Sequence, residues 1–148
     1  MIGLGVDQAK GLFFDSKKVQ SATTKAERRV LSRFGAYVRR SARSSIRKRK
    51  RTSAPGQPPS SHTGLLKRFI FFAYEPRRRS VVIGPVRLNH KSGEALPALE
   101  HGGPVRIVAG RRGRRRSRAV MIRKRPFMGP AFEQEKPKLP AMWRDSIR

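Results

Sequence analysis

The sequence predicts an α+β fold, in which a long basic N-terminal helix packs on a roughly four-stranded antiparallel sheet and a C-terminal helix completes the domain. Three observations predict it. An apolar stripe with helical spacing lies before residue 50, short apolar runs with strand character lie after residue 66, and the proline- and glycine-rich segment Ser53–Leu66 separates them. Because this segment can neither continue a helix nor lie inside a central strand, it marks the change from helix to sheet.

The composition points to a polyanionic partner. The 148 residues fit one domain, which we place at residues 15–147, and hydrophobic residues are only 36%, so partners are expected to complete part of the surface. The net charge of +27 favours nucleic acid. An anionic membrane is a weaker candidate because no long apolar run is present, and the lack of cysteine excludes disulfides and thiolate metal sites. No signal peptide is recognisable, which suggests a cytoplasm or a particle assembled there.

The first element, residues 1–14, is apolar-rich but contains three glycines. It is a poor helix, and the sequence allows either an edge strand or an arm that packs on a neighbouring molecule.

The long helix is predicted from apolar residues at three- and four-residue steps. Asp15 or Ser16 could cap it early, and Thr24 with Glu27 three residues on gives a stronger capping-box signal. We expect it to run out into Lys48–Arg51. No acidic residue after Glu27 balances the basic face, so the face is either a solvated helix surface or, more consistently with its imbalance, a surface that needs an anion nearby. The stripe consists of Val19, Ala22, Ala26, Val30, Phe34, Val38, Ala42 and Ile46. The basic face consists of Arg28, Arg29, Arg33, Arg39, Arg40, Arg43 and Arg47.

The sheet is predicted from four apolar runs. Leu65–Tyr74 and Ser80–Gly84 form a hairpin around a proline turn, and Val105–Ala109 and Ala119–Arg123 supply the third and fourth strands. A short apolar segment, Ala95–Glu100, precedes the third strand. Pro130 suits the first position of the C-terminal helix, which carries its own apolar face.

Residues 110–118, between the third and fourth strands, are predicted to form a flexible basic loop, because they contain no large apolar residue to anchor them. The loop is either a phosphate-binding site, a solubilising tip or a docking site for an acidic protein surface. Its arginines are Arg111, Arg112, Arg114, Arg115, Arg116 and Arg118.

Enzymatic, metal and cofactor sites are not predicted. His62, His90 and His101 are scattered without the spacing of metal ligands, and Glu94 and Glu100 lie six residues apart without a recognisable pocket. The glycines near residue 110 lack the Gly-Lys-Ser/Thr ending of a phosphate-binding loop.

Three motifs together resemble a known family. A proline-rich loop ends in His62–Lys67 (HTGLLK), a Leu-Glu-His-Gly-Gly segment occupies Leu99–Gly103, and Arg125–Phe132 reads RPFMGPAF. In this order, over roughly residues 15–147, the chain resembles the neck or tail-completion proteins of long-tailed bacteriophages, the head–tail joining family. The arginine-rich loop is more basic than is general in that family, which fits a ring whose lumen holds DNA.

The resemblance implies a structural virion protein of the phage neck, made in the host cytoplasm, with no enzymatic activity. It implies a homo-oligomeric ring of six or twelve copies around the DNA channel, between head-completion or portal-side proteins and tail-terminator proteins. The arginines of residues 110–118 would face double-stranded DNA without sequence preference. Contacts between subunits or rings would involve Pro55, Pro58, Pro59, His62, Thr63, Gly64, Phe127 and Met128, with the N-terminal arm.

A second interpretation belongs to a different class. Composition alone favours a free nucleic-acid-binding protein of ribosomal type, in which the same charge would lie on RNA. Binding without sequence preference favours the neck interpretation, whereas tight binding selective for structured RNA favours the second.

Overall fold

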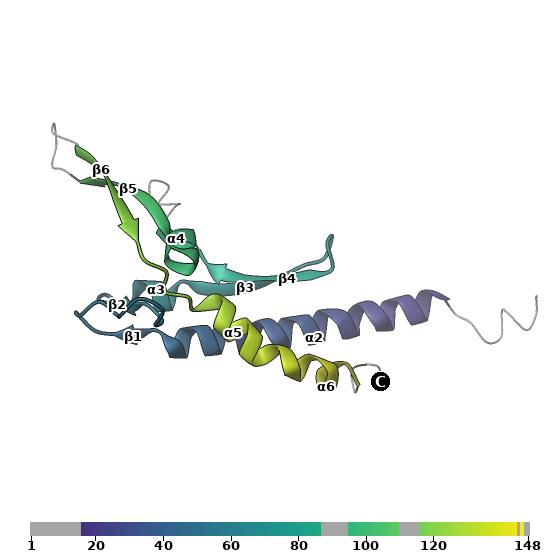
Figure 1. Cartoon of the computed structure of the whole chain (residues 1–148). Coiled ribbons are helices and arrows are strands. Elements are labelled where there is room, and N and C mark those ends of the chain that lie inside the picture. The colour runs from purple at the N-terminus through teal and green to yellow at the C-terminus, as the bar shows by residue number, and fades with distance from the viewer. Residues whose placement is uncertain (1–15, 87–94, 110–115, 145, 147–148) are drawn as a thin grey trace, which may run out of the picture.

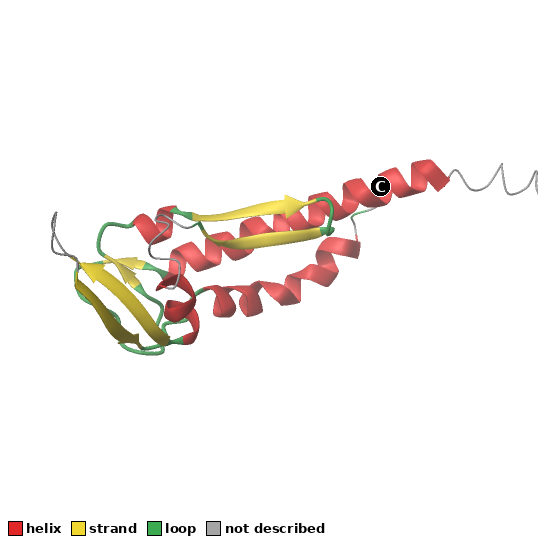
Figure 2. Cartoon of the chain, turned by 90° about the horizontal axis from the view of Figure 1, so that it is seen from above, coloured by secondary structure: helices red, strands yellow, loops and turns green. Residues whose placement is uncertain are grey.

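The computed structural model describes residues 16–86, 95–109, 116–144 and 146. It has the predicted α+β class, with a long N-terminal helix, antiparallel hairpins and a C-terminal helical segment (Figures 1 and 2). The elements in chain order are α2 (Ser16–Ser45), β1 (Arg47–Lys48), β2 (Ser60–Ser61), α3 (Leu65–Arg68), β3 (Ile70–Glu75), β4 (Ser80–Pro85), α4 (Ala95–His101), β5 (Gly103–Ala109), β6 (Arg116–Ile122), α5 (Met128–Glu135), the 3-10 turn η1 (Lys136–Lys138) and α6 (Leu139–Arg144). None of the helices in these described ranges is long and apolar enough to cross a membrane.

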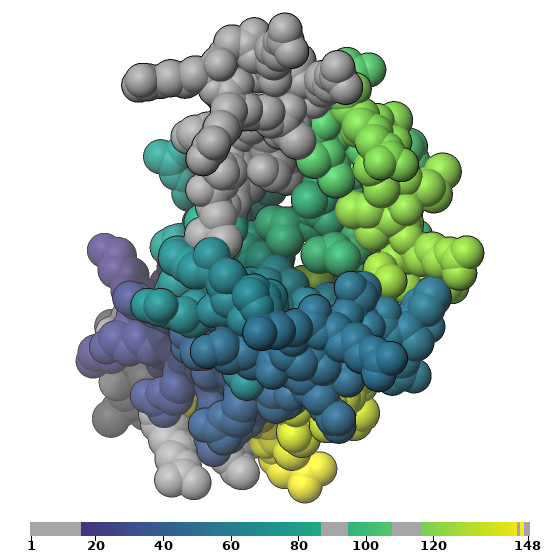
Figure 3. Space-filling model, turned by 90° about the vertical axis from the view of Figure 1, so that its left-hand side faces the viewer, coloured from purple at the N-terminus to yellow at the C-terminus, as the bar shows by residue number. Residues whose placement is uncertain are grey.

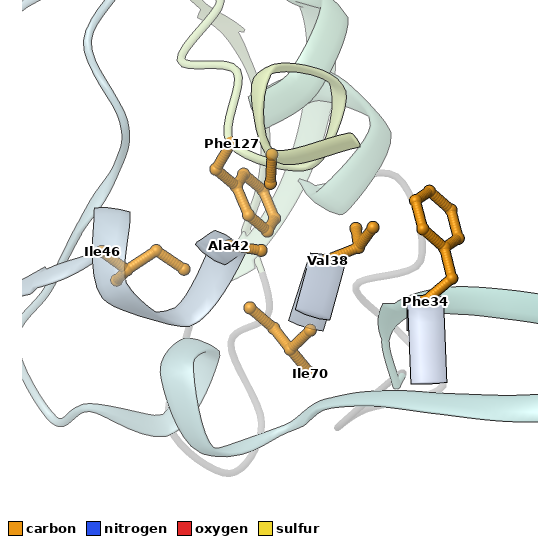
Figure 4. Close-up of a cluster of buried hydrophobic side chains, with 7 residues drawn as sticks. Phe34, Val38, Ala42, Ile46, Ile70 and Phe127 are labelled. Atoms are coloured by element: carbon orange, nitrogen blue, oxygen red, sulfur yellow. The ribbon is translucent and has the colours of Figure 1, made fainter. Parts of the chain in front are cut away.

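Helix α2 organises the body of the molecule. The β3–β4 hairpin lies along one side of α2, and α5 and α6 lie along another (Figures 1 and 2). The predicted apolar stripe is buried from Ala26 to Ile46, whereas Val19, nearer the N-terminal end, is exposed. The core between these elements is formed by Phe34, Val38, Ala42, Ile46, Ile70, Phe127 and Ala131 (Figure 4).

The helix ends earlier than predicted. It stops at Ser45, and Arg47–Lys48 is a short extended strand paired in parallel with Ser60–Ser61. The hydroxyls of Ser44 and Ser45 donate hydrogen bonds to the carbonyls three residues earlier, at 2.8 and 2.9 Å. Such bonds compete with the helical ladder and weaken the last turn.

The four predicted strands form two separate antiparallel hairpins, β3–β4 and β5–β6, and not one continuous sheet. The first hairpin buries its inner face on α2, through Ile70 and the half-buried Phe72 and Val81. The second hairpin projects from the end of the body where α2 meets β1, away from the N-terminal end of α2 (Figure 1). Its strands carry Arg106 and Arg118, which are exposed, so their charges stay in water.

Two shorter segments also differ from expectation. The apolar run from Leu65 begins with one helical turn, α3, and becomes a strand only at Ile70. Gly64, with φ of +76°, supplies the left-handed residue before that turn. The segment before the third strand is a helix, α4.

A buried carboxylate links α2 to α5. The hydroxyl of Ser41 donates to Glu135 Oε1 at 2.6 Å, and Lys138 Nζ donates to Oε2 at 2.5 Å. These two hydrogen bonds, that of Lys138 first, lower the pKa of the Glu135 carboxyl below its ordinary value, although burial acts in the other direction.

Candidate nucleic-acid interface

The β5–β6 hairpin carries the candidate interface. Its register pairs Ile107 with Arg118 and Ala109 with Arg116. Arg118 is exposed, as are Arg106, Arg123 and Lys124 along the two strands and their exit. A projecting two-stranded ribbon with basic side chains is a shape that can lie against a nucleic-acid backbone or enter a groove.

The predicted loop at residues 110–118 is shorter in the structure. Residues 116–118 belong to strand β6, because they pair with Ile107–Ala109 of β5. The other four predicted DNA-facing residues, Arg111, Arg112, Arg114 and Arg115, lie outside the described residues.

Two of the sequence motifs, Leu99–Gly103 and Arg125–Phe132, meet the start of the proline-rich segment where this hairpin joins the body, whereas His62–Lys67 takes no part in these hydrogen bonds. We call this region the junction, defined by Ser53–Gly56, Leu99–Gly103 and Lys124–Gly129. Its centre is the Glu100 carboxylate, which accepts the backbone N–H groups of Phe127 at 3.0 Å, Met128 at 3.2 Å and Gly129 at 2.7 Å. Glu100 therefore caps the beginning of α5 from a different helix, where donors lack partners within the helix and a negative charge is favoured.

Sequence reasoning missed this role of Glu100. The carboxylate lies 27 to 29 positions before its partners, so no local capping pattern signals it. In the structure Gly129 leaves room for the carboxylate, since a Cβ atom there would lie 3.1 Å from Glu100 Oε1.

Arg125 ties the proline-rich segment to the same junction. Its backbone N–H donates to the Leu99 carbonyl at 2.6 Å, and its Nε donates to the Ser53 carbonyl at 3.0 Å. In return, the Gly56 N–H donates to the Lys124 carbonyl at 2.9 Å. Gly102 suits this close approach, because its φ is +82° and a Cβ atom there would lie 3.3 Å from the Lys124 nitrogen.

The residues predicted at subunit or ring contacts are divided by the structure. Pro55, His62 and Thr63 are exposed, Pro58 and Gly64 are half-buried, and Pro59 is buried. Met128 packs against the core and is half-buried. Phe127 is only 1% exposed, so its ring belongs to the core of its own subunit and is not available to a neighbour (Figure 4).

The basic face of α2 is partly used inside the molecule. Arg39 Nε donates to the Ile70 carbonyl at 2.8 Å, and its guanidinium lies over the Phe71 ring. Arg33 similarly contacts Tyr37. Arg28, Arg29 and Arg40 are exposed and form no ion pair with a described residue.

The outer face of β3–β4 carries exposed apolar side chains, although the Arg39 guanidinium and the Phe69 ring contact Phe71. Phe71 and Val82, which alternate with the inward Phe72 and Val81, are 45% and 60% exposed, and Val86 beyond the hairpin is 51% exposed. Exposed apolar side chains gathered on one two-stranded hairpin mark a contact surface.

No protein-family model, no curated protein sequence and no solved structure matches the chain.

Proposed function

We propose that the protein is a structural component of the phage neck, the head–tail connector, and forms a ring around the DNA channel that joins the capsid portal complex to the tail. The observation that carries the proposal is the separation of two surfaces on one subunit. An apolar face on β3–β4 suits association with protein, and the projecting β5–β6 hairpin, whose exposed Arg106 and Arg118 lie beside the exposed Ile107 and Met121, suits DNA through its arginines.

The apolar face, residues Phe71, Val82 and Val86, is assigned to a second copy of the chain. A two-stranded hairpin leaves unpaired edges and one uncovered face, and a neighbouring subunit in a ring would cover both. The net charge of +27 makes copies repel one another, so association is expected to need DNA or the adjacent ring.

The resemblance of the three motifs to neck proteins supports the same proposal. Two of these motifs, Leu99–Gly103 and Arg125–Phe132, meet at the junction, which fixes the hairpin on the body through Glu100 and Arg125. Repeated around a ring, the hairpin arginines would form a belt of positive charge that binds phosphates without reading sequence. The expected neighbours are a portal-side or head-completion protein and a tail-terminator protein, and the expected location is the virion neck.

The test is electron microscopy of particles from a producer strain in which this gene is deleted. DNA-filled heads beside separate, finished tails are the expected result, and the unaltered gene supplied in trans should restore joining. Normally joined virions from the deletion strain would refute the proposal.

The exposed cationic surface also favours the second candidate, a free RNA-binding protein of ribosomal type. Competition binding separates the two functions. A neck protein should bind duplex DNA and structured RNA with similar, strongly salt-dependent affinity. Selective binding of structured RNA that survives moderate salt would favour the second candidate.

A further inference from the structure

A second cationic surface lies at the end of the body, beside the base of the projecting hairpin. Arg47, Lys48, Arg49, Lys50 and Arg51 are consecutive and all exposed. The sequence pattern predicts them at the end of the helix, where their charge would serve the helix dipole. In the structure they follow the end of α2 and are free for another role.

This segment is held in place and is not a loose tail. Ile46, directly before it, is 1% exposed and belongs to the core. Arg47 and Lys48 pair with Ser60 and Ser61 in a parallel ladder. Beyond them, the Arg51 carbonyl accepts a hydrogen bond from the Ser60 hydroxyl at 2.7 Å. Ordering the backbone in advance lowers the entropy cost of binding to these side chains.

The junction brings a second basic segment alongside. The hydrogen bonds from Gly56 to Lys124 and from Arg125 to Ser53 join the loop after residue 51 to the strand exit at residues 123–125. Figure 3 views this end of the molecule, where the blue segment that contains β1 and β2 lies beside the yellow-green segment of β6. Arg123 and Lys124 are both exposed there.

Nothing acidic in the neighbouring sequence neutralises this surface. Residues 47–74 and 101–132 contain no aspartate or glutamate. Glu100 lies at the junction, but both of its oxygens accept backbone hydrogen bonds from α5. None of the seven basic side chains at 47–51 and 123–124 forms an ion pair with a described residue. Like charges gathered so closely favour an external anion.

We propose that Arg47–Arg51 with Arg123 and Lys124, here called the basic end face, binds the phosphate backbone of duplex DNA. The choice of duplex DNA among polyanions rests on the proposed function. Single-stranded binding is disfavoured because residues 47–51 and 123–124 include no aromatic side chain on which a base could stack. Binding is through phosphates and is independent of sequence. The end face extends the DNA-binding surface from the hairpin onto the body of the same subunit.

The experiment is a salt titration of binding to a short fluorescent DNA duplex, followed by anisotropy. The test variant carries Arg47→Gln, Lys48→Gln, Arg49→Gln, Lys50→Gln and Arg51→Gln. The matched control carries Lys17→Gln, Lys25→Gln, Arg77→Gln, Arg79→Gln and Arg144→Gln, which removes three arginines and two lysines from exposed positions outside the end face, the β5–β6 hairpin and the predicted basic face of α2. The two variants therefore have the same net charge and differ only in where the charge was removed.

The test variant is expected to bind at least about tenfold more weakly near 0.1 M salt. The slope of log K against log salt should fall by about 0.9 for each phosphate that the variant no longer neutralises. The control is expected to change affinity by less than about threefold. Equal reductions in affinity for the two variants, or a larger reduction for the control, would overturn the proposal.

A second variant guards against misfolding of the first. Arg123→Gln with Lys124→Gln alters the other segment of the end face without touching β1 and should reduce the slope by about 1 to 2. An unchanged slope for a folded Arg123→Gln, Lys124→Gln protein would overturn the proposal. If the variants bound an acidic protein more weakly but bound duplex DNA as tightly as the unaltered protein, the end face would be a protein-binding surface and the proposal would likewise be overturned.

The two proposals fail in distinguishable ways. If deletion of the gene leaves virions joined, the neck function fails, whereas a slope difference between the matched variants still assigns phosphate binding to the end face. If deletion prevents joining but the variants bind DNA alike, the end-face proposal fails and the neck function stands.

Discussion

The body around α2 and the end that carries the β5–β6 hairpin are held together by different forces. The body is built on buried apolar side chains from α2, β3 and α5. At the hairpin end, the buried apolar residues among the described side chains are only Ala98 and Val105, and the attachment relies on polar contacts from Glu100 and Arg125. The comparison teaches that stability resides in the body, whereas the placement of the basic surfaces depends on a few hydrogen bonds.

The largest expected effect comes from removing a core side chain of the body. Phe127→Ala should reduce the free energy of unfolding by about 3–5 kcal/mol, because it removes a fully buried ring and leaves a cavity between α2, β3 and α5. Chemical denaturation measures the reduction. Phe71→Ala is the control, since Phe71 is half exposed and should cost much less. Equal reductions in the two variants would mean that Phe127 is not part of the core.

The next effect tests the junction. Glu100→Gln removes the charge and one acceptor from three backbone donors of α5, which should cost about 1.5–3 kcal/mol. Hydrogen exchange should show that the amides of Phe127–Gly129 open more often, while those in the middle of α2 change less.

Glu133→Gln is the matched control for the junction, because Glu133 is an exposed glutamate on the same helix α5. It should change stability by less than about 0.5 kcal/mol. If Glu100→Gln were as mild as this control, the junction would not depend on the carboxylate.

Sequence reasoning captured the body better than the junction. The stripe from Ala26 to Ile46 and the first hairpin follow from local periodicity, which the core then uses. The hydrogen bonds of Glu100 and Arg125 join residues far apart in the chain, and no local pattern specifies them. The separation of the two hairpins was also not predictable, because strand spacing does not reveal which strands share a sheet.

The basic segments also show that local sequence patterns do not specify which distant segments lie together. Charge alone identified the arginines of residues 110–118 and the α2 face as candidates. It did not show that residues 47–51 leave the helix, or that the loop that follows them is hydrogen-bonded to Lys124 and Arg125, because those bonds are formed at the junction. The start of the proline-rich segment and the motifs Leu99–Gly103 and Arg125–Phe132 are therefore the parts that bring the basic segments together.

A smaller effect is expected from filling the space at Gly35, where α2 packs closely on the β3–β4 hairpin. A Cβ atom at Gly35 would lie 2.8 Å from Val81 Cγ2 and 2.9 Å from Phe72 Cδ2. Crowding of this kind costs about 1–3 kcal/mol, while alanine in a helix interior regains about 1 kcal/mol over glycine. Gly35→Ala should therefore reduce unfolding free energy by about 0–2 kcal/mol. If Val81 causes the crowding, Val81→Ala should cost less stability in the Gly35→Ala protein than in the unaltered protein, and the double-mutant cycle would show a coupling energy. If Phe72 alone causes the crowding, the costs of the two substitutions should add.

The smallest expected effect is on the arginines between β5 and β6 together with Arg116, the first residue of β6. Replacing Arg111, Arg112, Arg114, Arg115 and Arg116 together by glutamine should change the free energy of unfolding by less than about 0.5 kcal/mol, since the sequence around them offers no large apolar residue to pack against. Removing five like charges from a chain of net charge +27 also relieves self-repulsion. The thermal midpoint measures this, and duplex DNA affinity measured on the same protein should fall. A large drop in the midpoint would show that these arginines stabilise the fold, and the division between a stabilising body and a binding end would no longer hold.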